Sequence, residues 1–494
     1  MQVRRPLCLV AAACLVASVA TLALPATPAR AAELLVGAAT TEITPPQPVS
    51  LAGQHRLRIS QKVDTPLLAV ALALESRDGD KGIDHAIIIT CDLVAIRDGL
   101  QARLRERLGS RLAGVDLRKI FLTATHTHTA PTTLEDTSVF NIPKEGVMQP
   151  AEYVDFLTGR LADVAAKAWE SRAPGGVSWT FGEAMIGHNR RSVYSNGKAR
   201  MYGPTNTPEF RGLEGYEDHG VDMLFFWSAE KQPRAVAINV ACTAQEVEGQ
   251  SSVNADYWHE VRKQVGPILA PDQPGLPVLG WISAAGDQSP HVQWRKKAID
   301  RMRSQRGLTT MQSIARCLTN AVTDTLDVAK KDIRTDVPFR HTVEDLSLPP
   351  RIISPSEYNN AKSRYETLAA MEKPTAADKF KMAYEKRVVD RYEQADQTPP
   401  FAVELHVIRL GDIAIATNPF ELFLDYGVQI EGRSPAVQTF VIQLAGGSGG
   451  YLPTEKAIKG GSYSGEPHTN KVGPEGGQML VDKTVEAINA LWKK

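Results

Sequence analysis

Two histidines separated by one residue stand in the segment Thr-Ala-Thr-His-Thr-His-Thr-Ala-Pro, residues 123–131. The apolar run before them, residues 119–124, predicts a buried strand. In an extended segment the side chains of residues i and i+2 point to the same side, so the imidazoles of His126 and His128 can face one site. Neutral imidazole is a good zinc ligand. On its own, the pattern is compatible with a metal site and with two polar loop histidines, and it does not distinguish between them.

Two further segments place polar side chains directly after apolar runs, where active sites of α/β proteins usually lie. In Gly-Asp-Gln-Ser-Pro, residues Asp287 and Ser289 either form a plain turn or contact a substrate, and His291 follows them. In Asn-Pro-Phe-Glu-Leu, a buried Glu421 would need a metal ion or an arginine as its partner, and an exposed glutamate is the alternative.

A glycine-rich run precedes Tyr451 in Gly-Gly-Ser-Gly-Gly-Tyr-Leu-Pro-Thr, and Tyr463 follows twelve residues later. Glycine lets a backbone approach a ligand closely. Tyrosine is an uncommon metal ligand, so the residue types alone predict a ligand-binding loop and no particular role for either tyrosine.

Two adjacent arginines, Arg190 and Arg191, stand in Gly-His-Asn-Arg-Arg. A guanidinium group can bind a substrate carboxylate or sulfate through two parallel hydrogen bonds, and a solvated loop is the alternative. Segments 216–220 and 255–259 combine acidic, aromatic and imidazole side chains, a mixture that suits sugar binding.

Taken together, these segments resemble the N-terminal catalytic domain of the neutral/alkaline non-lysosomal ceramidase family. The resemblance begins at residues 36–46, Val-Gly-Ala-Ala-Thr-Thr-Glu-Ile-Thr-Pro-Pro. It continues, in the family's order, through the His-Thr-His, Gly-Asp-Gln-Ser-Pro, Asn-Pro-Phe-Glu-Leu and Gly-Tyr-Leu-Pro-Thr segments. It extends from about Leu34 to the C-terminus, except over residues 295–395.

The resemblance implies a secreted zinc amidohydrolase that cleaves the amide of an N-acyl sphingoid base with one zinc ion. It implies three zinc ligands, which are His126, Glu421 and Tyr451. It also implies that His128 faces the attacking water or the developing oxyanion, and that Tyr463 donates a hydrogen bond near that oxyanion. Such donors stabilise charge that develops only in the transition state.

Five further residues complete the predicted site. The resemblance places Ser289 in the substrate pocket, and we expect its neighbour Asp287 to take part in catalysis. We expect Arg190, Arg191 and His291 to contact the substrate.

The sequence departs from the family at one zinc ligand. The family places a further histidine after a cysteine, and here Thr243 follows Cys242 in Asn-Val-Ala-Cys-Thr. Threonine is a poor zinc ligand, so either another residue replaces the histidine or the metal is weakly bound, different or absent. The possible replacements are Gln245, His188, His219 and His259, of which we favour His259 or His219. This departure predicts a relative that acts on a substrate other than ceramide.

The order of apolar patterns predicts an α/β fold of mixed sheets with flanking helices. Runs rich in branched apolar residues predict strands over residues 67–76, 85–96, 119–128, 221–229, 234–244, 276–290, 401–410, 411–420 and 437–447. Amphipathic patterns predict helices over residues 99–112, 154–172, 257–269, 311–331, 354–373, 376–394 and 483–493. Residues 295–395 are predicted to form a mainly helical insertion or cap, and residues 33–494 a single ceramidase-like catalytic domain.

The N-terminus has the pattern of a secretory signal peptide, with Arg4 and Arg5 before an apolar stretch and small residues near Ala32. We therefore expect residues 1–32 to be removed, the protein to be secreted or periplasmic, and no transmembrane anchor to remain. Lys+Arg and Asp+Glu both number 56, which gives no charge excess that would attract nucleic acid.

Three cysteines, Cys91, Cys242 and Cys317, follow the signal peptide. An odd number allows one disulfide at most. Their apolar sequence surroundings favour buried, inert thiols.

Three functions follow from these patterns. The first is zinc-dependent hydrolysis of an amide in an N-acyl lipid or an N-acylated amino sugar. The second is a glycan hydrolase without metal that uses paired carboxylates from among Glu217, Asp256, Asp287 and Glu421. The third is an exported binding protein that has lost its metal and its activity.

Overall fold

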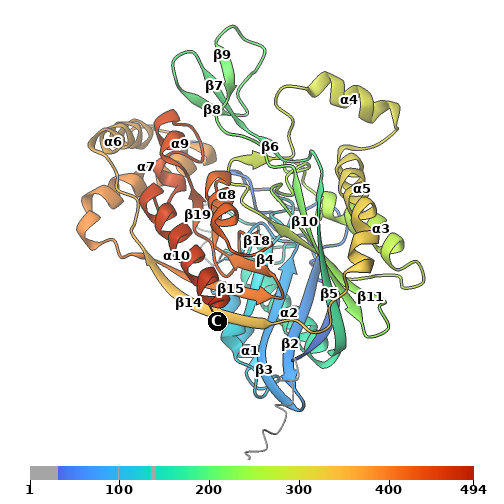
Figure 1. Ribbon diagram of the computed structural model, residues 1–494. Coiled ribbons are helices and arrows are strands. Elements are labelled where there is room, and N and C mark those ends of the chain that lie inside the picture. Colours follow the sequence, from blue (N-terminus) through green and yellow to red (C-terminus); the bar gives the residue numbers. More distant parts are fainter. Residues whose placement is uncertain (1–31, 98, 135–140, 494) are drawn as a thin grey trace, which may run out of the picture.

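The computed structural model describes residues 32–97, 99–134 and 141–493. At the centre of these residues lies an eight-stranded sheet, in the order β12-β11-β10-β5-β1-β2-β3-β4 (Figure 1). Its pairs are antiparallel except β3–β4 and β11–β12, which are parallel. The strands are β1 (Glu33–Glu42), β2 (Leu68–Asp78), β3 (Lys81–Cys91), β4 (Ile120–Ala124), β5 (Ala173–Glu183), β10 (Gly220–Ser228), β11 (Pro233–Val240) and β12 (Val278–Ile282).

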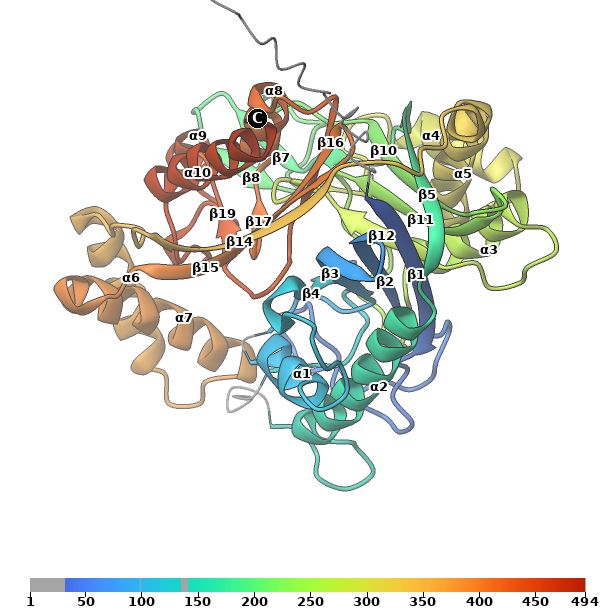
Figure 2. The ribbon, with the colours of Figure 1, turned by 60° about the horizontal axis from the view of Figure 1, so that its bottom comes forward.

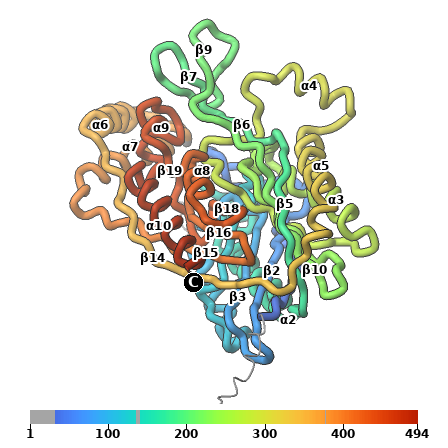
Figure 3. Tube along the Cα trace, in the orientation of Figure 1, coloured from blue at the N-terminus to red at the C-terminus, as the bar shows by residue number. Residues whose placement is uncertain are grey.

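A second sheet of order β14-β15-β16-β18 packs on one face of the first. It consists of β14 (Phe339–Leu348), β15 (Phe401–Leu410), β16 (Ile413–Thr417) and β18 (Gln438–Ile442). Short strands pair as β13 (Gln288–Ser289) with β6 (His188–Asn189), and as β17 (Phe420–Leu422) with β19 (Gly450–Leu452). A small sheet projects from the body (Figure 3) and contains β7 (Arg191–Tyr194), β8 (Ala199–Met201) and β9 (Phe210–Leu213).

Helices cover both outer faces of this pair of sheets. Figure 2 shows α1 and α2 on one side and α8 and α10 on the far side. The α-helices are α1 (Leu100–Leu108), α2 (Pro150–Glu170), α3 (Tyr257–Leu269), α4 (Lys296–Gln305), α5 (Thr310–Lys331), α6 (Pro355–Ala369), α7 (Ala376–Glu393), α8 (Leu424–Arg433), α9 (Glu455–Gly460) and α10 (Pro474–Trp492). Short 3₁₀ turns occur at Leu117–Lys119, Ala395–Gln397 and Pro467–Thr469.

The alternation of side chains along each strand produces these layers. On β2 the small residues Ala69, Ala71 and Ala73 face α1 and α2, and the larger Leu72 and Leu74 face the second sheet. Small residues let a helix lie close to a strand, whereas branched residues fill the space between two sheets. The α/β fold class predicted from the sequence is confirmed, with helices outside and two mixed sheets inside.

Two elements differ from the sequence prediction. No strand was predicted after the helix that ends near residue 172, but Ala173–Glu183 forms β5, which pairs with β10 from Gly175 to Glu183. Helix α10 begins at Pro474, nine residues before the predicted start at residue 483. In both places tertiary packing overrides the local preference of glycine against regular structure.

The elements of region 295–395 pack in three different places. Helix α5 packs on the main sheet, where Ile314, Leu318 and Val322 join its core. Strand β14 belongs to the second sheet and pairs with β15 over ten residues. Only α6 and α7 form a separate hairpin at one side of the molecule, around a small core of their own (Figure 1).

The predicted signal peptide lies outside the described residues, apart from Ala32. Within the described ranges, no helix is long and apolar enough to cross a membrane. The three cysteines among the described residues are free; Cys91 and Cys242 are buried and Cys317 is partly exposed. Burial raises the pKa of the Cys91 and Cys242 thiols, which keeps them protonated and unreactive.

The core between the sheets can be tested at Phe440 on β18. Its ring is fully buried and meets the edge of Trp281 from β12, with ring centroids 6.1 Å apart. Phe440→Ala should lower the free energy of unfolding by about 3–5 kcal/mol, because it opens a cavity between two rigid layers. Denaturant unfolding measures this loss. Val437→Ala, at a side chain that is 76% exposed just before the same strand, should change stability little.

The contact between α1 and the second sheet should make stability depend on pH. Arg105 on α1 lies 2.7 Å from Glu404 on β15. Burial alone would raise the pKa of Glu404, but hydrogen bonds from His406 and Arg105 lower it to about 2. Because this folded-state pKa lies below the ordinary value, ionised Glu404 stabilises the fold at neutral pH, and this contribution is lost as the pH falls from about 5 to 2.

Glu404→Gln should therefore reduce the free energy of unfolding at neutral pH and flatten its fall between about pH 5 and 2. Urea unfolding at several pH values measures both effects. The matched change Glu344→Gln, at an exposed position on the neighbouring strand β14, should leave the pH profile unaltered. An unaltered profile in Glu404→Gln would contradict the explanation.

Candidate active site

A cleft of about 1070 Å³ opens beside the ends of several strands. Its described lining residues include five that the sequence predicts for the site: His126, His128, Glu421, Tyr451 and Tyr463. The structure therefore brings together residues that are up to 337 positions apart in the chain.

Strand ends and strand pairing position these groups. The two histidines follow β4 directly, at one edge of the main sheet. Strands β17 and β19 pair in parallel, and their register places Glu421 opposite Tyr451. A one-residue shift of this register would turn one of the two side chains away from the cleft.

His126 is fixed at both of its ring nitrogens. Its Nδ1 lies 2.6 Å from the carbonyl oxygen of Val94, and a carbonyl can only accept, so Nδ1 carries the proton. In the neutral ring Nε2 then keeps its lone pair, 3.4 Å from Oε2 of Glu421. The backbone of His126 is left-handed, with φ of 66°, and not extended as the sequence predicts. Such a conformation is rare for a residue other than glycine and concentrates at functional sites.

His128 belongs to a buried hydrogen-bonded chain. Its Nε2 accepts a hydrogen bond of 2.8 Å from the side-chain amide of Gln245, whose oxygen accepts one of 2.6 Å from the hydroxyl of Thr243. Its Nδ1 lies 3.3 Å from Oε2 of Glu248. Burial lowers the pKa of His128 to about 4, although Glu248 opposes this shift. His128 is therefore neutral at pH 7.

Glu421 is ionised despite its position at the base of the cleft. Burial would raise its pKa, but His126, a hydrogen bond from Tyr451 and the nearby charge of Arg190 lower it to about 2. Arg190 Nη2 donates to the Tyr451 hydroxyl over 3.1 Å and to the carbonyl of Gly286 over 2.8 Å. Burial and the charge of Glu421 raise the pKa of Tyr451, which remains a protonated donor.

Tyr463 lies in a tight loop that Arg191 holds from behind. Ser462 and Ser464, on either side of Tyr463, both have left-handed backbones, with φ of 72° and 70°. The fully buried guanidinium of Arg191 donates to the carbonyls of Tyr463 (2.8 Å) and Gly461 (2.7 Å). Its charge is balanced by Glu214 at 2.5 Å. The ion pair thus fixes the loop that presents Tyr463 to the cleft.

Three electron-rich atoms converge between these side chains. His126 Nε2 lies 3.1 Å from His128 Nε2 and 3.4 Å from Glu421 Oε2. With Nδ1 protonated in His126, and Gln245 donating to His128, all three atoms present lone pairs to one another. Such an arrangement is stable only with a proton or a cation between them.

Comparison with solved structures identifies the architecture. The chain superimposes on the crystal structure of neutral ceramidase from Pseudomonas aeruginosa with a TM-score of 0.66. The match covers 93% of this chain and 75% of that one, at 14% sequence identity. A structure described as ceramidase complexed with C2 matches equally well, with the same TM-score, identity and coverage. The chain has the neutral ceramidase fold. No family model and no curated protein matches the sequence.

Within this ceramidase fold, the other predicted site residues lie away from the cleft. Ser289 is fully buried, and its hydroxyl accepts from the backbone N–H of His291. Asp287 is buried and caps α8, since it accepts hydrogen bonds from the Leu424 N–H (3.0 Å) and the Asn189 amide (2.8 Å). His291 faces Glu246 and Glu248. Through these hydrogen bonds, Asp287 and Ser289 stabilise the loop behind the site.

The two arginines expected to bind substrate are both buried and used internally. Arg190 contacts Tyr451 from behind, and Arg191 is enclosed by the Tyr463 loop. Neither lines the cleft, so the structure does not support direct contact of either one with substrate.

None of the histidines proposed as replacement ligands reaches the cleft. His259 is partly exposed on α3, and His188 and His219 both lie beside Glu217, at 3.4 and 3.5 Å. Asp256 is buried at the start of α3, where it accepts from the backbone N–H groups of Val247 and Tyr257. Gln245 is the one replacement candidate that enters the cluster.

The residues present fit a metal ion with three protein ligands. His126, Glu421 and Tyr451 supply one imidazole, one carboxylate and one phenol, and the converging lone pairs call for a cation. Two ligands at about 2.1 Å from a tetrahedral ion lie about 3.4 Å apart, which agrees with the separation of His126 and Glu421. In the part of the chain that the structure describes, no group of three or more His, Cys, Asp and Glu side chains could hold a metal, so the set depends on Tyr451.

Glu248 and the wall of the cleft were not predicted. Glu248 contacts both His128 and His291, and its burial cost is outweighed by hydrogen bonds to these rings, which lower its pKa. It follows Gln245 in Cys-Thr-Ala-Gln-Glu-Val-Glu, where the alternation of acidic residues was the available signal. His55 and Tyr384 also line the cleft, from loops and helices without a motif.

The support of the Tyr463 loop can be tested at Arg191. Arg191→Met should lower the free energy of unfolding by about 3–5 kcal/mol, because it leaves Glu214 buried without a partner. Thermal and denaturant unfolding measure this. Arg200→Met makes the same change at an exposed position on the strand paired with β7 and should be nearly neutral. Equal stability of the two variants would show that Arg191 is not a structural anchor.

Proposed function

We propose that the protein is a hydrolase that cleaves the amide bond of an N-acyl compound, such as an N-acyl lipid or an N-acylated amino sugar. The observation that carries this proposal is the convergence of His126, His128 and Glu421 with two tyrosines at the base of one large cleft. The ceramidase fold supports it, and the sequence resemblance implies roles for the same five residues.

The proposal includes one zinc ion, held by His126, Glu421 and Tyr451. Bound there, zinc supplies a water of lowered pKa and polarises an amide carbonyl. Thr243 is not among the residues that line the cleft, and its hydroxyl is hydrogen-bonded to Gln245, so it is not part of the proposed ligand set.

His128 is the proposed general base. It is neutral at pH 7, so its Nε2 can take a proton from the attacking water once Gln245 gives up its hydrogen bond. Glu248, 3.3 Å from Nδ1, stabilises the imidazolium that forms.

Tyr463 is the proposed donor to the carbonyl oxygen. Burial raises the pKa of its phenol, so the hydroxyl keeps its proton at neutral pH. It can donate to the negative charge that develops as the amide is attacked. Arg190 acts behind Tyr451, where its positive charge stabilises ionised Glu421.

Export is part of the proposal, because residues 1–32 have the pattern of a signal peptide. The glycan hydrolase gains no comparable support. Glu421 is the only carboxylate among the described residues that line the cleft, and Asp256 and Asp287 are occupied by backbone N–H groups. Paired-carboxylate chemistry needs two such groups facing the same bond.

Metal analysis together with an amide substrate panel tests the proposal. The purified protein should hold about one zinc ion per chain and release fatty acid from N-acyl substrates, with activity lost on chelation and restored by zinc. His126→Ala should lose the metal and at least about a hundredfold in kcat/KM, because a ligand is removed. His259→Ala, at a histidine away from the cleft, should keep both.

The two parts of the proposal can fail separately. Full activity in the chelated protein would overturn the zinc ion while leaving the hydrolase. Bound zinc without hydrolysis of any N-acyl compound in the panel would overturn the amide substrate. Loss of neither metal nor activity in His126→Ala would overturn the assignment of the site.

A further inference from the structure

One face of α7 forms a wall of the cleft. Its lining side chains are Phe380, Tyr384, Arg387 and Arg391, spaced four, three and four residues apart. This spacing places all four on one stripe of a helix. The stripe combines two aromatic rings with two guanidinium groups and carries no acidic residue.

Ring contacts connect this stripe to the proposed reaction site. The Tyr384 hydroxyl lies 3.2 Å from Nδ1 of His55, and the His55 ring lies 5.3 Å from the ring of Tyr463. Tyr384 also stacks on His468, with centroids 4.9 Å apart. The guanidinium of Arg387 lies 5.1 Å from the centre of the Tyr384 ring. Arg387 is thus separated from Tyr463 by only two intervening rings.

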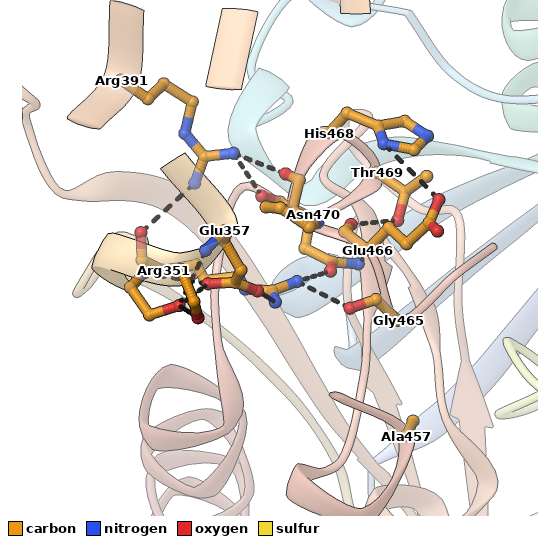
Figure 4. Close-up of polar contacts among 12 residues, drawn as sticks. Arg351, Glu357, Arg391, Ala457, Gly465, Glu466, His468, Thr469 and Asn470 are labelled. Carbon is orange, nitrogen blue, oxygen red and sulfur yellow. Dashed lines mark hydrogen bonds and ion pairs between the residues drawn. The ribbon is translucent and has the colours of Figure 1, made fainter. Parts of the chain in front are cut away.

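Arg391 fixes the position of the stripe and is fully used in doing so. It donates to the carbonyl of Pro467 (2.7 Å) and to that of Asn470 (2.8 Å), and Figure 4 shows Arg391 beside Asn470. Arg351, at the base of the α6–α7 hairpin, donates to the carbonyl of Gly465 (2.9 Å) and pairs with Glu357 (2.6 Å). The hairpin is therefore tied to the loop that follows Tyr463, and the side chain on the stripe that stays available for a ligand charge is Arg387.

The charges around the cleft are unequal. Its described lining residues include one carboxylate, Glu421, and five cationic side chains, which are Arg56, Arg97, Arg387, Arg391 and Lys471. Glu421 is already committed to His126 and Tyr451. Arg97 and Lys471 both contact Ser448, and Arg56 donates to the carbonyl of Gly249 over 3.3 Å, so the argument depends on Arg387.

The carboxylates nearest to Arg387 in sequence are paired elsewhere. Asp390 pairs with Lys386 at 2.7 Å, and Glu385 pairs with Arg364 at 2.7 Å. Among the described residues no carboxylate forms an ion pair with Arg387. The pKa of His468 is lowered to about 4, first by burial and then by nearby cations that include Arg387.

We propose that the substrate carries an acidic group, and that Arg387 binds this group at the mouth of the cleft. The inference rests on the proposed amide hydrolysis and specifies its substrate class: an N-acyl compound whose amine part bears a carboxylate, sulfonate, sulfate or phosphate. Phe380 and Tyr384 contact the apolar atoms between the amide and the acid. A guanidinium group recognises such anions through charge-assisted hydrogen bonds, which a neutral hydroxyl group cannot replace.

Two compounds that differ only in this group test the proposal. 8-(Dodecanoylamino)octane-1-sulfonate and 8-(dodecanoylamino)octan-1-ol share chain, amide and spacer, and end in a sulfonate and a hydroxyl. Their long spacer can pass the two rings between Tyr463 and Arg387. Calorimetry of binding and kcat/KM are measured for both. The full chain should prefer the sulfonate by about tenfold or more, and added salt should weaken this preference.

Variants of Arg387 show which residue is responsible. Arg387→Gln should remove the preference and Arg387→Glu should reverse it, while the affinity for the neutral alcohol stays within about threefold. Lys381→Glu makes the same charge change on α7, at an exposed residue that does not line the cleft, and should keep the preference. Unfolding curves that match the parent protein exclude loss of folding as the cause.

The possible results test the acidic substrate class separately from the proposed amide hydrolysis. Equal binding of both compounds, binding of neither, or a preference that survives in both Arg387 variants would overturn the acidic substrate. Hydrolysis of both compounds without preference would overturn it and leave amide hydrolysis standing. Selective binding that depends on Arg387, with no hydrolysis of either compound, would keep this inference and overturn the proposed function.

Discussion

The structure of the site depends on holding a charged carboxylate, Glu421, in a place with little water. An ion in such a position is unfavourable unless opposite charge and hydrogen bonds surround it. His126 approaches from the end of β4, Tyr451 from the parallel partner strand, and Arg190 from behind the tyrosine. Each of these groups needs its own fixed backbone, and this requirement accounts for the strained conformation at His126 and for the short β17–β19 ladder.

The pair of sheets makes this arrangement possible. Fully buried side chains between the sheets hold them rigidly, so that strand ends and loops remote in sequence meet at one place. The His-Thr-His segment leaves the edge of the main sheet, while Glu421 follows the second sheet. Side chains on such a scaffold keep their relative positions without relying on a flexible loop. Tyr463 is the exception, and there the Arg191–Glu214 pair provides the rigidity that a strand provides elsewhere.

The sequence predicts those site residues whose positions follow from the residues next to them in the chain. His126 and His128 follow an apolar strand, and Glu421 and Tyr451 follow glycine- or proline-marked turns, so their place in the fold could be inferred from neighbouring residues. The function of Arg191 could not, because a buried arginine and a substrate-binding arginine look alike until Glu214 is placed beside it. The same holds for Gln245, whose link to His128 spans 117 positions. Strand β5 could not be predicted from its own residues, because its glycines disfavour a strand and its pairing with β10 stabilises one.

The bonds from Arg351 and Arg391 to residues 465–470 couple two parts of the protein that look separate. If the α6–α7 hairpin swung outward to widen the entrance, it would pull on the segment next to Tyr463 and separate Tyr384 from His55 and His468. An outward position of the hairpin would therefore admit bulky molecules but break the contacts that hold the segment beside Tyr463. If Tyr463 donates to the substrate as proposed, the reaction is confined to ligands that fit the cleft while these contacts are intact.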